Sequence, residues 1–298
     1  MASRTWKTGG AKDIRIDGKI VVITGSNTGI GKETAKDLAK RGGHIIMACR
    51  NIKKTEEAAE EIKKEVPDAK LTVVELDLSS FQSIRECAKK ILETVPNIHI
   101  LINNAGVMAC PYAETKEGHE LQFGTNHLGH FLFTNLLLDR IKASAPARIV
   151  VVSSVGHRIG AKMHWDDLNM KNNYGPWKAY AQSKLANVLF AKELAEKLKG
   201  TGVTTYVLHP GAVDTELQRH MNDAGVFQKM FTSVSRKFMK TPVEGAQTTL
   251  YCALAEEIAN DSGLYYSDSK EKGPSRRALN KEDAKKLWDI SVALTNVG

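Results

Sequence analysis

The sequence has little of what marks a secreted, metal-bound or membrane-spanning protein. Its 298 residues include four cysteines, widely spaced and with no CxxC pair. This excludes a disulfide framework and a cysteine-rich zinc site, and it predicts buried free thiols in a reduced compartment. No run of about 18 apolar residues is present, so no membrane span is predicted. The polar residues 1–19 lack the apolar segment of a secretory signal.

Linkers, repeats and low-complexity segments are also lacking. The length then predicts one domain over residues 1–298, with a core at about 18–266. The net charge is +8, but the basic residues are interleaved with glutamates, and no basic motif carries interleaved aromatics. Nucleic acid is therefore not a predicted partner, whereas an anionic membrane surface is the better candidate. The expected location is the cytoplasm or the periphery of an intracellular membrane.

What the sequence does contain is a regular alternation of strand-like and helix-like segments. Short β-branched apolar runs occur at residues 19–24, 44–48, 71–76, 98–102, 148–152, 203–208 and 264–266, and helical patterns separate them. A closing helix is expected within 280–298. This alternation predicts an α/β fold, a Rossmann-type doubly wound parallel sheet of about seven strands flanked by helices on both faces. Ligands of such sheets bind beyond the carboxyl ends of the strands.

The first of these strand ends carries a glycine-rich loop. Its TGxxxGxG spacing places Gly25, Gly29 and Gly31 between a strand and a helix that runs to about residue 41. Glycines allow a tight turn and a close approach of the backbone, and a helix N-terminus favours a pyrophosphate. The loop predicts nucleotide binding, with a plain strand–helix turn as the alternative.

Tyr180 and Lys184 lie one turn apart on a helical pattern at about 178–199. A phenol with a pKa near 10 is a poor acid–base catalyst at neutral pH. An ammonium beside it favours the phenolate and lowers that pKa. The pair is therefore suited to exchange a proton with an alcohol or a carbonyl. The alternative is a solvated lysine beside a half-buried tyrosine.

Four motifs, in this order, resemble the short-chain dehydrogenase/reductase family. They are the glycine loop, Asn103-Asn-Ala-Gly106 after the fourth strand, Ser154 after the fifth, and the Tyr180–Lys184 pair. The resemblance covers about residues 18–266. Segments at 48–51, 122–130 and 208–211 further resemble the branch of retinol dehydrogenases 11 to 14, among which number 13 looks nearest.

The resemblance implies a role for each catalytic position. Tyr180 would be the general acid in carbonyl reduction and the base in alcohol oxidation. Lys184 would lower the pKa of Tyr180 and bind the nicotinamide ribose, and Ser154 would hydrogen-bond the substrate oxygen. Asn126 would hold a helix kink and the water that links Lys184 to solvent. Hydride transfer builds alkoxide character on the substrate oxygen, so hydrogen-bond donors must be in place beforehand.

None of the histidines predicts a metal site. His127 and His130 are three residues apart and have no matching acidic partners, so they are interpreted as packing or polar core residues. His209 is interpreted as a strand-end residue. No metal is predicted.

The residue after the second strand bears on the cofactor. NAD-binding sheets of this type usually place an acidic residue there, on the ribose diol. Here Arg50 follows the strand, and its planar fork would pair with a 2′-phosphate, which predicts NADP(H) rather than NAD(H). An arginine that only stacks on adenine is the alternative. The resemblance implies a cofactor site at Gly25, Asn27, Thr28, Gly29, Ile30, Gly31, Arg50, Asn51, Asp77, Leu78, Asn103, Ala105, Gly106, Tyr180, Lys184, Pro210, Gly211, Val213 and Thr215.

The expected substrate is a small hydrophobic molecule. The resemblance implies retinol and retinal, and a steroid, terpenoid or lipid-derived aldehyde would keep the same chemistry. A non-catalytic NADP sensor or scaffold is the alternative from another class, but such a protein has no need of Ser154, Tyr180 and Lys184. The long segment between Ser154 and Tyr180, which includes Trp177, is expected to shape the substrate site.

Residues 212–240 are expected to form a substrate lid. Apolar residues at helical spacing within 220–240, with lysines and an arginine between them, would touch a membrane surface. A helix packed on the sheet is the alternative.

Relatives often pair through the helices near residues 126 and 180, which implies a homodimer. Retinol dehydrogenases of this branch generally begin with a hydrophobic anchor, whereas this chain starts near where that anchor would end. Either it is a soluble relative or its anchor was removed.

Overall fold

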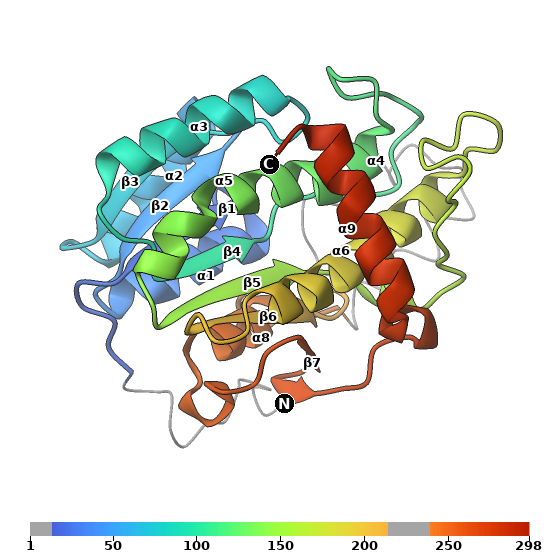
Figure 1. Cartoon of the computed structure of the whole chain (residues 1–298). Helices are drawn as coiled ribbons and strands as arrows, with labels where there is room; N and C mark the ends of the chain where they lie inside the picture. The colour runs from blue at the N-terminus through green and yellow to red at the C-terminus, as the bar shows by residue number, and fades with distance from the viewer. Residues whose placement is uncertain (1–13, 214–238, 298) are drawn as a thin grey trace.

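An eight-stranded sheet lies at the centre of the computed structural model, which describes residues 14–213 and 239–297 (Figure 1). The strand order is β3-β2-β1-β4-β5-β6-β7-β8. The strands are β1 (Ile20–Thr24), β2 (His44–Cys49), β3 (Lys70–Glu75), β4 (Ile100–Asn103), β5 (Ala147–Val152), β6 (Val203–His209), β7 (Leu264–Ser267) and β8 (Lys270–Glu271). Strands β1 to β7 pair in parallel. The eighth strand, antiparallel to β7, was not expected, because its two exposed residues give no sequence pattern.

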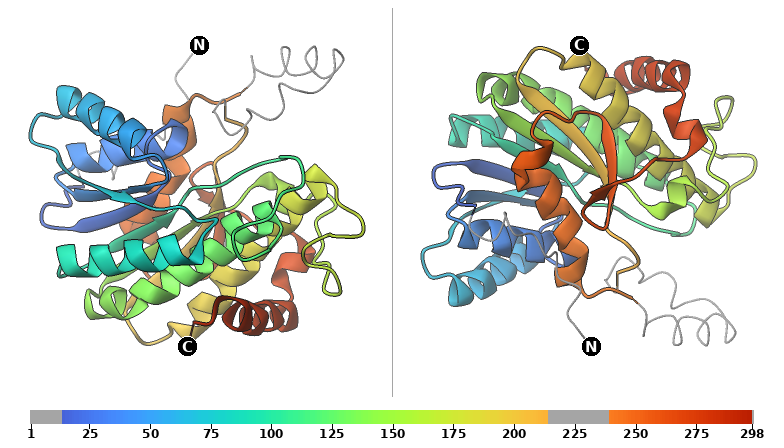
Figure 2. Two further views of the ribbon diagram at one scale, coloured as in Figure 1. Left: turned by 90° about the horizontal axis from the view of Figure 1, so that it is seen from above. Right: turned by 90° about the horizontal axis from the view of Figure 1, so that it is seen from below.

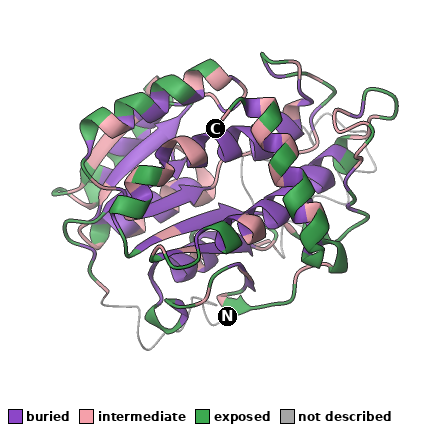
Figure 3. Ribbon diagram, in the orientation of Figure 1, coloured by how far each residue is buried: buried purple, intermediate pink, exposed green. Residues whose placement is uncertain are grey.

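The central strands are buried on both faces, as their uninterrupted apolar runs predict. All five residues of β1 and all four of β4 are buried. Neighbouring residues of β1 contribute to different cores, Val22 to one and Val21 and Ile23 to the other. Figure 3 shows the buried strands between helices whose outer faces are exposed. A hydrophobic core therefore lies on each face of the parallel sheet.

Helices cover both faces of this sheet (Figure 2). One face carries α1 (Gly29–Lys40), α2 (Ile52–Glu65) and α8 (Pro242–Leu254). The other carries α3 (Phe81–Thr94), α5 (Gly129–Ala143), α6 (Pro176–Lys197) and α9 (Lys281–Thr295). This confirms the doubly wound α/β fold, and α9 is the closing helix that the sequence predicts.

The helical region expected at about 118–143 is divided into three parts. A short helix, α4 (Leu121–Phe123), is followed by a π-helical turn at Gly124–Leu128 and then by α5. In this turn the backbone N–H of Gly129 donates to the carbonyl oxygen of Gly124, five residues back. Hydrophobic spacing alone cannot reveal such a change of hydrogen-bond register.

Two expectations drawn from composition concern the cysteines and the absence of a membrane span. All four cysteines are buried and free, as predicted. Burial raises the pKa of Cys87 to about 12. Within residues 14–213 and 239–297, no helix has both the length and the apolar character needed to cross a bilayer.

The strand order reverses at β1. The chain passes from β1 outward to β2 and β3, and then returns to β4 on the other side of β1. The connections that leave β1 and β4 therefore run to opposite faces of the sheet. Their divergence leaves a crevice beyond the carboxyl ends of the two strands.

Candidate active site

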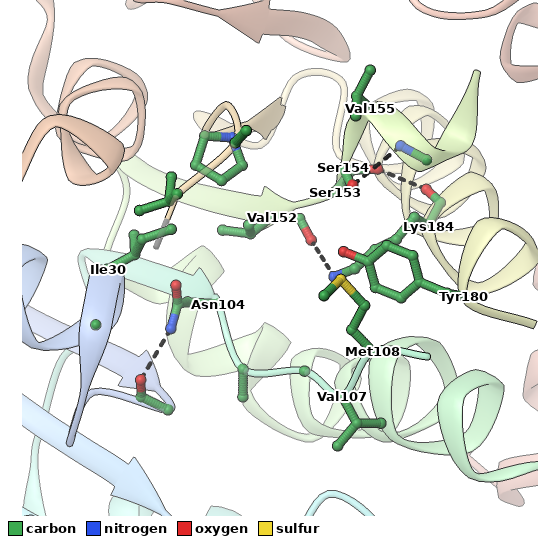
Figure 4. A pocket seen from close by; sticks show the side chains of 18 of the residues that line it. Ile30, Asn104, Val107, Met108, Val152, Ser153, Ser154, Val155, Tyr180 and Lys184 are labelled. Atoms are coloured by element: carbon green, nitrogen blue, oxygen red, sulfur yellow. Dashed lines mark hydrogen bonds between the residues drawn. The ribbon is translucent and has the colours of Figure 1, made fainter. Parts of the chain in front are cut away.

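A cavity of about 580 Å³ opens at the carboxyl ends of β1, β4, β5 and β6. This volume is in the usual range for a ligand pocket. Figure 4 shows Tyr180 and Lys184 together on one side, with Ser154 near them and with Ile30 and Asn104 across the cavity. Motifs that are far apart in the sequence are thus brought to one cavity.

The glycine loop forms one wall of this cavity. Gly25 and Gly29 have φ angles of 66° and 54°, which an L side chain rarely adopts. A Cβ added at Gly31 would lie 2.2 Å from the carbonyl oxygen of Gly25, so no side chain fits there. The N-cap of α1, Thr28, makes no side-chain capping bond, which leaves the first N–H groups of the helix to a ligand. The wall therefore suits a phosphate group.

Hydrogen bonds join this loop to the segment after β4. The side-chain amide of Asn104 donates to the carbonyl oxygens of Thr24, at 2.9 Å, and Gly25, at 3.1 Å. In return, the hydroxyl of Thr24 accepts from the backbone N–H groups of Asn104, at 2.9 Å, and Ala105, at 3.0 Å. These four bonds fix the positions of the two loops relative to each other.

The Thr24 hydroxyl has a further partner in His130, whose Nε2 lies 2.9 Å away. The other ring nitrogen, Nδ1, lies 3.0 Å from the carbonyl oxygen of Asn126. Because a carbonyl only accepts, Nδ1 carries the proton, and Nε2 of the neutral ring accepts from Thr24. Burial lowers the pKa of His130 to about 4, so the ring is neutral at pH 7. The predicted core histidine thus links the glycine loop to the π turn.

Asn126 is fully buried in the π turn and does not line the cavity. Its amide forms a reciprocal pair with the backbone of Val107, donating to the carbonyl at 2.9 Å and accepting from the N–H at 2.8 Å. It also donates to the hydroxyl of Ser183 at 2.9 Å. The helix irregularity expected here is present as the π turn. The water that Asn126 would hold remains a prediction.

Tyr180 and Ser154 lie on the wall formed by α6 and the turn after β5. Only 5% of Tyr180 is exposed. Burial raises the pKa of the Tyr180 phenol to about 12, and a hydrogen bond with the Ser154 hydroxyl partly opposes this rise. The oxygen of Ser154 accepts from the backbone N–H of Gly156 at 3.1 Å, which orients the hydroxyl. The phenol is therefore fully protonated at neutral pH.

Lys184 is buried beside this phenol, with its Nζ 5.8 Å from the centroid of the Tyr180 ring. The ammonium donates to the carbonyl oxygen of Val152 at 3.2 Å. Burial lowers the pKa of Lys184 to about 8. Burial disfavours the charged forms of both side chains, so the pKa of Tyr180 is raised here, and the lowering of that pKa by Lys184 remains a prediction.

Some of the predicted site residues line the cavity, and others lie away from it. Those that line the cavity are Gly25, Asn27, Thr28, Gly29, Ile30, Gly31, Ala105, Gly106, Ser154, Tyr180, Lys184, Pro210, Gly211 and Val213. They come from the connections after β1, β4, β5 and β6 and from α6, all at the same edge of the sheet. This shared position is what the polar and glycine residues after the strands predict.

Three predicted cofactor residues that follow β2 and β3 do not line the cavity, namely Arg50, Asn51 and Asp77. Arg50 is exposed, one residue beyond the end of β2. The side chain of Asn51 accepts from the backbone N–H of Lys54 at 2.9 Å and so caps α2. The carboxylate of Asp77 accepts from the backbone N–H of Ser79 at 2.9 Å. Asn51 and Asp77 thus have local structural partners whether or not a cofactor is bound.

Two further predicted residues face the protein interior. Leu78 is buried in the core on the α3 side of the sheet. The side-chain amide of Asn103 donates to the hydroxyl of Thr134 at 2.8 Å, and only 1% of this residue is exposed. These residues brace the loops from behind and do not line the cavity. Thr215 lies outside the described residues.

The cavity also has lining residues that the sequence did not single out. They are Asn104, Val107, Met108, Val152, Ser153, Val155, Gly156, Ile159, Ala181, Ala212 and Met239. Asn104 could have been found, since it stands inside the Asn-Asn-Ala-Gly motif. The apolar residues after Ser154 belong to no periodic pattern, and only the folded structure places them here.

The comparisons with known proteins agree with this geometry. The family model described as short chain dehydrogenase matches residues 19–225. Retinol dehydrogenase 12 of Homo sapiens is 51% identical over 96% of this chain and 89% of its own length. Retinol dehydrogenase 13 of Homo sapiens is 48% identical over 99% of this chain and 90% of its own length. The expectation that number 13 would be nearest is thus wrong, because number 12 is more identical.

Solved structures of similar fold are also found. An uncharacterised protein from Mycobacterium paratuberculosis is 37% identical, with a TM-score of 0.77 over 96% of this chain and 97% of that one. L-sorbose reductase from Gluconobacter frateurii, solved with NADPH and L-sorbose, is 22% identical, with a TM-score of 0.69 over 85% of this chain and 96% of that one. The second likeness concerns the fold alone. The chain belongs to the short-chain dehydrogenase family and is an oxidoreductase of the alcohol dehydrogenase kind.

Proposed function

We propose that this enzyme uses NADP(H) to interconvert a hydrophobic alcohol and its aldehyde or ketone, with retinol and retinal as the favoured pair. The observation that supports this most is that the glycine loop, Ser154, Tyr180 and Lys184 all line one cavity. One wall suits a dinucleotide phosphate, and the opposite wall carries a proton donor and a hydrogen-bond donor.

The residues present fit a bound dinucleotide. The Gly31 position leaves no space for a Cβ, because the start of α1 packs against the Gly25 carbonyl oxygen and the Asn104 amide, and this close packing keeps the helix N-terminus beside the glycine loop. The glycine loop would hold the pyrophosphate, Lys184 the nicotinamide ribose, and Pro210 with Gly211 the carboxamide. Arg50, exposed beyond β2, would pair with a 2′-phosphate, which favours NADP(H) over NAD(H). The cofactor supplies or accepts the hydride, and the chain supplies the remaining chemistry.

In carbonyl reduction, the Tyr180 hydroxyl gives its proton to the substrate oxygen as negative charge develops there. The Ser154 hydroxyl donates a hydrogen bond to the same oxygen. The pKa of about 12 keeps Tyr180 in the protonated form that reduction requires. Alcohol oxidation would use these groups in reverse, with the phenolate oxygen of Tyr180 as base.

A hydrophobic substrate is supported by the side chains around the cavity mouth. Val155, Ile159 and Trp177 line the cavity, although 44%, 70% and 48% of these residues are exposed. Large apolar groups exposed together at a mouth mark a binding surface. The similar proteins named retinol dehydrogenases favour a retinoid. The lid at 212–240, membrane contact by 220–240 and a homodimer remain part of this proposal, and most of the lid lies outside the described residues.

Replacement of Tyr180 by Phe tests the catalytic part of the proposal. We expect Tyr180→Phe to retain NADPH binding, measured by fluorescence titration, and to lose about 100-fold or more in kcat, because the transferable proton is removed. The matched control is Tyr112→Phe, which removes a hydroxyl from an exposed tyrosine that bonds Glu114. Unchanged turnover in Tyr180→Phe would remove Tyr180 from the mechanism.

The substrate is tested separately, by NADPH consumption with all-trans-retinal, straight-chain aldehydes and ketosteroids. We expect the highest kcat/KM with retinal. A higher value with a ketosteroid or a straight-chain aldehyde would replace the retinoid while keeping the chemistry. A higher kcat/KM with NADH than with NADPH would contradict the cofactor assignment.

A further inference from the structure

A second hollow, of about 680 Å³, lies behind the turn that carries Ser154. We call it the arginine hollow, and define it by its lining residues His157, Arg158, Ala161, Ser275, Arg276, Arg277, Leu279, Asn280 and Asp283. It shares no lining residue with the dinucleotide cavity, which is lined by the neighbouring residues Val155, Gly156 and Ile159. The two openings therefore lie on either side of one short segment.

The charge of the arginine hollow is unbalanced. Its lining includes three arginines, Arg158, Arg276 and Arg277, and one acidic residue, Asp283. Among the described residues, none of these four side chains forms an ion pair with another. Arg276 has no hydrogen-bond partner either within those residues. An uncompensated cluster of guanidinium groups in a concave site attracts oxyanions.

Two of the three arginines are held in place by the fold. The Arg158 guanidinium donates to the carbonyl oxygen of Gly273 and lies 5.6 Å from the centroid of the Tyr265 ring. The Arg277 guanidinium donates to the carbonyl oxygen of Ala161 at 2.6 Å. Each of these bonds uses part of a group with five N–H donors, so donors remain for a ligand. The side chains are thus oriented beforehand, which lowers the entropic cost of binding.

A buried polar atom at the same place also lacks a partner. The hydroxyl oxygen of Ser275 is inaccessible to solvent and makes no hydrogen bond within the described parts of the chain. The backbone N–H of Ser275 donates to Nε2 of His157 at 3.1 Å, and Nδ1 of that ring donates to the carbonyl oxygen of Ser154 at 2.6 Å. One neutral imidazole therefore joins the arginine hollow to the catalytic turn.

We propose that the arginine hollow binds a phosphate ester, through Arg158, Arg276 and Arg277, at a site separate from the dinucleotide cavity. A planar guanidinium fork matches the oxygens of phosphate in a bidentate geometry. The hollow is much larger than a phosphate ion, and Ala161 and Leu279 give it an apolar wall for the esterified group. Two sources share this chemistry, a soluble phosphomonoester and the headgroup of an anionic phospholipid.

The test uses the full chain with saturating NADPH, so that the glycine loop is not open to the probe. The soluble arm measures binding of glycerol 3-phosphate by calorimetry. The lipid arm measures sedimentation with vesicles of equal parts phosphatidylcholine and phosphatidic acid, compared with vesicles of phosphatidylcholine alone. Arg276→Gln is the first variant, because this side chain has no partner to lose within the described residues. Arg276→Gln with Arg277→Gln is the second.

We expect Arg276→Gln to weaken binding about tenfold in at least one arm, and the double variant to weaken it further. Lys89→Gln with Lys90→Gln removes two exposed charges from α3 and is the matched control, which should bind as the wild type does. Binding of glycerol 3-phosphate identifies a soluble ester, and binding of acidic vesicles alone identifies a lipid headgroup. Absence of binding in both arms, or an equal loss in the α3 control, would overturn the proposal.

Discussion

At the glycine-loop end of the cavity, hydrogen bonds join main-chain groups and buried side chains. At the mouth, in contrast, the wall consists of exposed apolar side chains. Thr24, Asn104 and His130 form one hydrogen-bonded network. Ile159 and Trp177 are largely or half exposed. The first end depends on backbone geometry and buried polar bonds, so it accepts few residue types. The second can change its side chains without loss of the fold, which is how substrate preference diverges on a constant scaffold.

The largest effect is expected from Gly31→Ala at the glycine-loop end. The new Cβ would lie 2.2 Å from a carbonyl oxygen and 2.6 Å from the Asn104 amide, so the loop must open. We expect affinity for NADPH to fall about 100-fold or more, since the backbone could no longer approach the phosphates. The control is Gly273→Ala, where an added Cβ has no atom within 4 Å. Equal affinities for the two variants would refute the close-approach model of this loop.

The next effect in size concerns Arg50, which belongs to the same end but is exposed. We expect Arg50→Asp to shift the ratio of kcat/KM for NADPH and NADH by about 10- to 100-fold toward NADH, because a charge-assisted bond becomes a repulsion. Lys53→Asp, on α2, makes the same change of charge at a nearby exposed position and is the control. If the ratio moves equally in both variants, Arg50 does not read the 2′-phosphate directly.

A smaller effect is expected at His130, which links the glycine loop to the π turn. We expect His130→Phe to weaken NADPH binding about tenfold, because Thr24 and Asn126 each lose a hydrogen bond. His127→Phe is the matched control, since His127 is also fully buried but bonds Ser291 at 2.8 Å instead.

A double-mutant cycle then separates this link from general destabilisation. If His130 acts through Thr24, then Thr24→Val combined with His130→Phe should lower the affinity for NADPH by less than the product of the single effects. If the two single effects on the affinity for NADPH multiply in full, or if His127→Phe loses as much affinity, then the His130 ring only fills space.

The smallest effect is expected at the mouth. We expect Ile159→Ser to raise KM for retinal a few-fold, because about one apolar contact is lost, and to leave the affinity for NADPH unchanged. Leu279→Ser is the control, because Leu279 is 55% exposed but lines the arginine hollow and not the cavity. A parallel loss of NADPH affinity in Ile159→Ser would remove the distinction between the two ends.

The sequence predicts the structure of the glycine-loop end well, because the backbone geometry and the burial required there are compatible with few residue types. A backbone that must turn at positive φ or approach a carbonyl closely selects glycine at positions 25, 29 and 31. Buried strands select β-branched apolar runs, so β1, β2 and β4 are found within one or two residues of their predicted limits.

Other features depend on packing that no local pattern records. Asn103 and Asn104 are adjacent, yet one faces Thr134 in the core and the other faces the glycine loop. The motif alone does not say which amide reaches the ligand. The pKa of Tyr180 follows from how completely α6 and the turn after β5 cover it, and the motif contains only the neighbouring lysine. Arg50 follows the last residue of β2, and the sequence does not show that this position lies outside the cavity.

The π turn at Gly124–Leu128 has a consequence for chain length. A π turn accommodates one residue more than an α turn, so every side chain after it is rotated by about 100° relative to an uninterrupted helix. Removing a single residue here would straighten the helix and swing the amide of Asn126 away from the backbone of Val107. The spacing of this segment is therefore as tightly constrained as its composition, and an insertion or deletion within it would be less tolerated than most substitutions.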